Sequence, residues 1–80
     1  MGLAATEKEL AGKASRFLKA EMKRVGVTYA QMAERLKEHG LIDETQDSIT
    51  SKLARGTFAA TFFLAVVAAL GLDGIQLEDL

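Results

Sequence analysis

The sequence contains no cysteine and no proline. The lack of cysteine excludes disulfide bridges and thiolate zinc sites, and it leaves the redox compartment undetermined. The lack of proline suits an all-helical chain, because proline breaks or kinks a helix when it falls inside one. The only histidine, His39, has no cysteine or clustered pair of carboxylates near it, so it does not make a metal site. We therefore expect no metal ion and no cofactor.

Patterns that indicate a membrane protein, a secreted protein or an enzyme are also missing. The longest nearly apolar run covers residues 58–72 and is broken by Thr61 and Gly71, whereas a membrane span needs about 20 apolar residues. The start M-G-L-A-A-T-E-K-E-L lacks the basic and apolar regions of a secretory signal. There is no nucleophile–base pair for catalysis. We therefore expect a cytoplasmic protein that is not an enzyme and does not enter a membrane.

The composition is that of one small globular domain, expected to span residues 1–80. Hydrophobic residues make up 49% of the chain and charged residues 26%, which is not the balance of a disordered chain. The formal net charge is -1, but residues 1–37 carry eight basic and four acidic residues, whereas residues 38–80 carry two basic and seven acidic residues. One face of the domain can therefore be basic although the total charge is close to zero.

Apolar residues spaced three and four apart, together with capping signals, predict two helices in the first half of the chain. The first covers about residues 6–24, with a Thr6–Glu9 capping box, and stops at Gly26. The second begins at a capping box formed by Thr28 and Gln31, and Gly40 ends it. The face of the first helix opposite its apolar stripe is basic and carries Lys13, Arg16, Lys19, Lys23 and Arg24.

A third helix is predicted to begin at Asp43, with Gln46 completing a capping box, and to end at Gly56. Its expected inner face is marked by Ile42, Ile49 and Leu53. The tail over residues 75–78 alternates apolar and polar residues, which is typical of a short strand or an extended arm. The predicted fold class is therefore all-α, a compact four-helix domain with a short extended C-terminal tail.

The fourth predicted helix, residues 59–70, is apolar around nearly its whole circumference. Such a helix must be covered on most sides. In so small a domain the expected covers are the other three helices and a second subunit, which predicts a homodimer. The apolar residues assigned to this dimer interface are Phe58, Phe62, Phe63, Val66 and Val67.

Four short motifs follow one another in a known order: K-R-V-G at 23–26, T-Y-A-Q-M-A at 28–33, I-T-S-K-L-A-R-G at 49–56 and A-A-L-G-L at 68–72. On these motifs, residues 17–77 resemble the lambda-repressor-like (XRE-type) helix-turn-helix family. The chain is also similar to a group of short uncharacterised bacterial proteins that share T-Y-A-Q-[LM]-A-E-R-L and K-[IL]-A-R-G-T-F. The family resemblance implies a central helix-turn-helix, double-stranded DNA as the partner, and a dimeric transcriptional regulator.

Two features depart from the family pattern. The segment between Met32-Ala33 and Arg55-Gly56 is longer than usual, and the extra residues fall at K-E-H-G-L-I-D-E. Either the second helix is extended, or the turn is longer than the tight one that fixes the two helices. Tyr29 occupies the position where family members often place a phosphate-contacting Gln, and a packing role suits it better.

In a helix-turn-helix, the exposed N-terminal part of the third helix reaches base edges, while the start of the second helix holds a phosphate. Side chains that can bond to bases or phosphates lie at these places and at the end of the first helix. The predicted DNA-contacting residues are Gln31, Thr45, Gln46, Ser48, Thr50, Lys52, Arg55, Lys23 and Arg24.

The acidic start of the third helix supports a different interpretation. Asp43, Glu44 and Asp47 suit the helix dipole but repel phosphates unless they are turned away from the duplex. Gln46 can equally be a cap, and Lys52 can be a solvated charge near the helix end. The alternative function is therefore a protein-interaction or adaptor module that keeps the fold without binding DNA.

Overall fold

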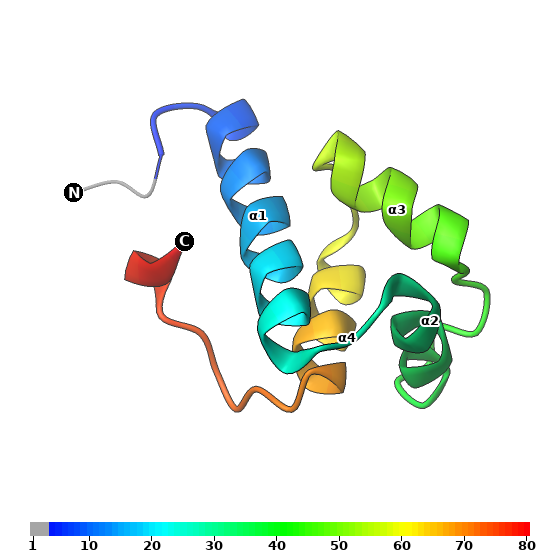
Figure 1. Ribbon diagram of the computed structural model, residues 1–80. Coiled ribbons are helices and arrows are strands. Elements are labelled where there is room, and N and C mark those ends of the chain that lie inside the picture. Colours follow the sequence, from blue (N-terminus) through cyan, green and yellow to red (C-terminus); the bar gives the residue numbers. More distant parts are fainter. Residues whose placement is uncertain (1–3) are drawn as a thin grey trace.

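Four α-helices and one short 3-10 turn form the computed structural model, which describes residues 4–80 (Figure 1). The elements are α1 (Glu7–Val25), α2 (Tyr29–Lys37), α3 (Gln46–Arg55), α4 (Ala60–Ala69) and η1 (Leu77–Asp79). No strand occurs in the described part of the chain. The predicted all-α, four-helix fold class is therefore confirmed.

The starts of α1 and α2 follow the predicted capping pattern. The Thr6 hydroxyl accepts a hydrogen bond from the backbone N–H of Glu9 at 3.1 Å, although the Glu9 carboxylate reaches back to Ala5 and not to Thr6. At α2 the box is complete, because Thr28 and Gln31 each accept a backbone hydrogen bond from the other, at 3.1 and 2.9 Å. These local signals therefore place both helix starts correctly.

The start of α3 lies further along the chain than predicted. Thr45 is the N-cap, and its hydroxyl and that of Ser48 each accept a backbone hydrogen bond from the other residue, at 3.1 and 2.8 Å. The predicted N-cap Asp43 and the predicted capping role of Gln46 are therefore wrong. Ile42 lies outside the helix and is 69% exposed, so its assignment to the inner face is also wrong.

The connection between α2 and α3 is a long turn over residues 38–45. Of the two alternatives for the extra length, the structure has the longer turn, because α2 ends at Lys37. The backbone N–H of Leu41 donates to the carbonyl of Leu36 at 3.0 Å, and the Leu41 side chain packs against the core. The turn is thus anchored to the end of α2 before it continues into α3.

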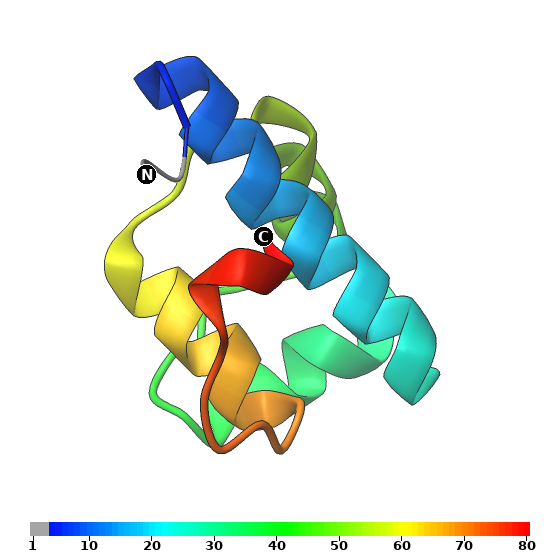
Figure 2. The same cartoon turned by 90° about the vertical axis from the view of Figure 1, so that its left-hand side faces the viewer.

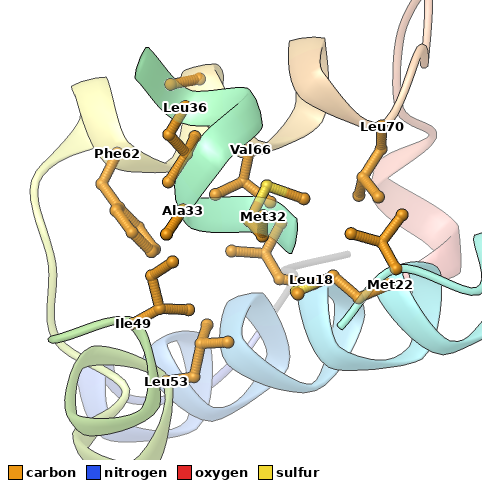
Figure 3. Packing of buried hydrophobic residues seen from close by; sticks show 12 residues of the cluster. Leu18, Met22, Met32, Ala33, Leu36, Ile49, Leu53, Phe62, Val66 and Leu70 are labelled. Carbon is orange, nitrogen blue, oxygen red and sulfur yellow. The ribbon is translucent and has the colours of Figure 1, made fainter. Parts of the chain in front are cut away.

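The hydrophobic core lies where the four helices meet, and Figure 3 shows its side chains. The helix α2 packs against α3 and α4, and α1 packs against the same two helices. Burial of side chains of this size contributes about 1.5–3 kcal/mol each, which makes the core the main stabilising feature. Its members are Leu18, Met22, Val27, Met32, Ala33, Leu36, Ile49, Leu53, Phe62, Ala65, Val66 and Leu70.

Burial in this core corrects part of the predicted dimer interface. Phe62 is 2% exposed and Val66 is fully buried inside the monomer, so neither offers surface to a second subunit. Phe58, Phe63 and Val67 are only partly buried and pack against the core from outside.

The covering of α4 is incomplete. Its outward side leaves Leu64 65% exposed, so one face of this apolar helix is open in the monomer.

Among residues 4–80, no single helix is long and apolar enough to cross a membrane. Only α3 and α4 together reach the required length and hydrophobicity, and they are bent by 118° to each other.

The C-terminal tail folds back along α1, as Figure 2 shows. The Lys13 ammonium donates a hydrogen bond to the backbone carbonyl of Leu80 at 3.0 Å. Residues 77–79 form the 3-10 turn η1, so the strand predicted as one alternative for residues 75–78 does not form, while Gln76 before the turn has extended backbone. Partial burial of Ile75 and Leu80 accounts for the return of the tail to the domain.

Candidate nucleic-acid interface

The outer face of α3 is exposed and mostly polar. Ile49 and Leu53 point into the core, and the residues turned away from them are exposed: Gln46, Asp47, Thr50, Ser51, Ala54 and Arg55. Three predicted DNA contacts, Gln46, Thr50 and Arg55, therefore lie on this outer face. The Thr50 hydroxyl donates to the Gln46 carbonyl at 2.8 Å, which leaves its oxygen lone pairs available as acceptors.

The Lys52 side chain is held by contacts within the protein and does not lie on the outer face of α3. Its ammonium forms an ion pair with Glu44, in the turn before the helix, and lies 5.1 Å from the centroid of the Phe62 ring. Its side chain is 29% exposed. The sequence predicts that Lys52 contacts DNA, but in the structure the charge of its side chain is already balanced by Glu44.

The same contact holds Glu44 ionised. Partial burial raises the pKa of the Glu44 carboxyl, but hydrogen bonds from Lys52 and Ser48 and the charge of Lys52 outweigh that effect. The pKa of Glu44 therefore lies below its ordinary value. One of the three carboxylates expected to repel phosphate is thus paired within the protein.

Thr45 and Ser48, also predicted to contact DNA, form the capping box of α3. Besides capping, the Ser48 hydroxyl donates to the Glu44 carboxylate at 2.6 Å. Their hydroxyl groups are therefore engaged in hydrogen bonds that define the start of the helix. These contacts explain why the two residues are needed even without a ligand.

The remaining predicted contacts lie at the ends of α1 and α2. The Gln31 amide oxygen caps α2, and its NH₂ group keeps its donors for another partner. Arg24 pairs with Glu21, whereas Lys23 is exposed and forms no ion pair within residues 4–80. Of these three residues, Lys23 and Gln31 retain polar groups directed to solvent.

A groove between α1 and the C-terminal end of α3 carries positive charge, and only Arg55 among its basic residues is a DNA contact predicted from the sequence. The basic groove, as we name it, has a volume of about 380 Å³, and its basic lining residues are Lys8, Arg16, Lys19 and Arg55. All four are exposed, and no acidic residue lines the groove. Figures 1 and 2 both show the end of α3 beside the N-terminal half of α1.

Small residues bring the two walls of the basic groove together. The Ser15 hydroxyl, the buried polar side chain of α1, donates to the Leu53 carbonyl in α3. Gly56 ends α3 with φ at 73°, a left-handed conformation that favours glycine, and a side chain there would meet the Ala11 backbone at 3.5 Å. At Gly12, the Arg16 guanidinium lies 3.0 Å from where a Cβ would be.

The basic face of α1 can be recognised in the sequence, but the groove cannot. Lys8, Arg16 and Lys19 lie at helical spacing on one side of α1, which was the available signal. The contribution of Arg55, far along the chain, depends on how α3 packs against α1. The spacing of residues in the sequence does not predict that packing.

Comparison with known proteins identifies a family for this chain. No curated protein and no solved structure matches it. Residues 1–75 match the family described as a domain of unknown function, DUF6471. Among residues 4–80 there is no cluster of His, Asp and Glu side chains that could hold a metal ion. The match covers nearly the whole four-helix domain, and the chain therefore belongs to the DUF6471 family.

Proposed function

We propose that this protein is a small sequence-specific DNA-binding protein that acts as a dimeric transcriptional regulator. The observation that carries the proposal is the arrangement of α2, the turn and α3, with the outer face of α3 exposed and polar. A helix presented in this way fits the major groove, which is about 12 Å wide. The resemblance of residues 17–77 to lambda-repressor-like proteins supports the same function.

The proposed recognition surface has distinct roles for its side chains. Gln46, in the first turn of α3, can pair with the two adenine groups that face the major groove. Asp47 can accept a hydrogen bond from the cytosine amino group, so this carboxylate need not oppose DNA binding at a suitable base. Arg55, at the other end of the outer face, is placed for a phosphate.

The proposal of a dimer rests on the small size of the monomer and on the open apolar face of α4. One monomer offers few cations to a duplex, so two linked recognition helices should bind much better than one. In a dimer they would read half-sites about 34 Å apart. The exposed Leu64, flanked by the partly buried Phe63, lies on the open face of α4 that a second subunit can cover.

A selection experiment tests this function. The full chain is mixed with a pool of duplexes of random sequence, and bound DNA is sequenced after several rounds. We expect enrichment of a short two-fold symmetric site, and Gln46→Ala should relax the preference at one position by about 1–3 kcal/mol. Lys37→Gln, on α2 in an ion pair with Glu34, serves as the control. Absence of any enriched sequence would contradict the proposal.

A second function, that of a protein-interaction or adaptor module, is favoured by the acidic charge around the start of α3. Asp43 and Asp47 are exposed around the start of α3, and the formal net charge is -1. A surface with these carboxylates suits a basic protein segment better than a phosphate backbone. If the selection yields no DNA and Asp47→Asn weakens binding to a basic peptide, the adaptor function replaces the first proposal.

A further inference from the structure

We propose that the basic groove binds the sugar-phosphate backbone of duplex DNA, in the stretch that flanks the bases read by α3. The inference rests on the proposed DNA-binding function and adds a second contact surface, on α1, to the helix-turn-helix. The groove is formed by residues 8–19 of α1 and by residues 53–57 at the end of α3. Its partner is recognised by charge, whatever the base sequence.

The charges of the groove cations are not balanced by ion pairs in the described part of the chain. Arg24, Lys37 and Lys52 each pair with a glutamate. The four groove cations form no ion pair with any residue from 4 to 80, although the chain has 11 acidic residues. Like charges in one groove repel one another and destabilise the free protein. A polyanion in the groove removes that repulsion.

The groove cations on α1 form a long row. The ends of the row, Lys8 and Lys19, are 11 residue steps apart in α1, which is about 16 Å at the rise of an α-helix. One DNA strand carries a phosphate about every 3.4 Å along the duplex axis. A row of this length therefore spans several consecutive phosphates, which favours a polymer backbone over a single phosphate ion.

The floor of the groove is accessible to a polymer backbone. The lining residues between the cations include Ala11, Gly12, Ala54 and Gly56, whose small size allows a backbone to come close to the groove floor. Arg55 belongs both to the groove and to the outer face of α3. A duplex lying against α3 can therefore continue into the groove without leaving the protein surface.

The proposal is tested by the salt dependence of binding. Lys8→Gln/Lys19→Gln removes two groove cations, and Lys13→Gln/Lys37→Gln removes the same charge outside the groove. Arg16 is left unchanged because it also lines a second groove beside Glu21 and Asp79. Binding to a mixed-sequence duplex of about 20 base pairs is measured by fluorescence anisotropy between about 50 and 200 mM salt. Thermal unfolding followed by circular dichroism confirms that each variant is folded.

We expect the groove variant to bind about tenfold to a hundredfold more weakly at about 0.1 M salt, with a salt slope smaller by about 2. The loss should be equal for all duplex sequences, and the control variant should keep the wild-type slope. If the groove variant also keeps the wild-type slope, the groove proposal fails while the proposed function stands. If the wild-type protein binds no duplex at low salt, both fail.

Discussion

The hydroxyl of Ser15 in α1 donates a hydrogen bond to the backbone carbonyl of Leu53 in α3. Ser15 is 5% exposed, so this bond lies in the interior, beneath the basic groove. It satisfies a carbonyl in the last turn of α3, where intrahelical partners run out. The same contact thus fixes the distance between α1 and α3.

Replacement of Ser15 by Ala should lower the free energy of unfolding by about 1–2 kcal/mol, because the Leu53 carbonyl loses its buried partner. Ser51→Ala is a matched control, since Ser51 is exposed in the same helix as Leu53 and should change stability by less than about 0.5 kcal/mol. Urea unfolding measures both changes. Equal effects at the two serines would show that the buried hydrogen bond contributes nothing specific.

The ion pair of Glu44 with Lys52 predicts a dependence of stability on pH. The pKa of Glu44 is lowered in the folded chain, so the pair stabilises the fold above the unfolded pKa of about 4.3. That contribution is lost as the pH falls through the lower, folded-state pKa. Glu44→Gln should therefore destabilise the protein by about 1–2 kcal/mol near pH 7, a cost between those of exposed and buried pairs, and by much less at low pH.

The measurement is urea unfolding of both proteins across the acidic range. Asp73→Asn, which changes an exposed carboxylate in the tail, is the control and should run parallel to the wild type. A gap between wild type and Glu44→Gln that stays constant down to the lowest pH would contradict the linkage.

Neighbouring residues at the start of α3 should separate stability from DNA recognition. Thr45→Ala removes the N-cap hydroxyl and should cost about 1 kcal/mol of stability. Gln46→Ala leaves the cap intact and should change stability by less than about 0.5 kcal/mol, while it relaxes base preference. Thermal unfolding and binding to a selected duplex, measured on both variants, check the pair. If neither variant changes the base preference, Gln46 does not belong to the recognition surface.

The open face of α4 leads to a prediction about assembly. Leu64→Asp places a charge on a side chain that is 65% exposed, so the monomer should stay folded while a dimer formed through α4 dissociates. Ile42→Asp, at a residue 69% exposed in the turn before α3, is the control and should leave the dimer intact. Analytical ultracentrifugation distinguishes the species. A wild-type protein that remains monomeric at high concentration would refute the dimer.

The parts of the fold that sequence predicted well are those decided by neighbours in the chain. The Thr28–Gln31 box and the stop at Gly26 involve contacts within one turn, and both are present. At α3 two cap patterns overlap, D-x-x-Q at 43–46 and T-x-x-S at 45–48. The second forms, and it leaves Glu44 outside the helix, where it accepts hydrogen bonds from Ser48 and Lys52.

The site was harder to predict because its charges are arranged by long-range packing. From the sequence alone Lys52 looks like a free cation, but in the structure the turn before α3 places Glu44 beside it. From the sequence alone Arg55 looks like a single charge at a helix end, but the packing of α3 against α1 places it in the same groove as lysines of α1. In both cases the partner lies in a different element, which residue spacing within one helix does not reveal.

The weak start of α4 has a consequence for how the protein opens. Ala59 gives this helix no side-chain cap, and its C-terminal end is held from outside by the Arg35 guanidinium, which donates to the Ala69 carbonyl at 3.1 Å. Ten mostly apolar residues do not hold a helix in water without such support. The exposed and uncapped first turn of α4 should therefore exchange its amides by local fraying, whereas the amides around the buried Ala65 and Val66 should exchange only when the whole domain unfolds.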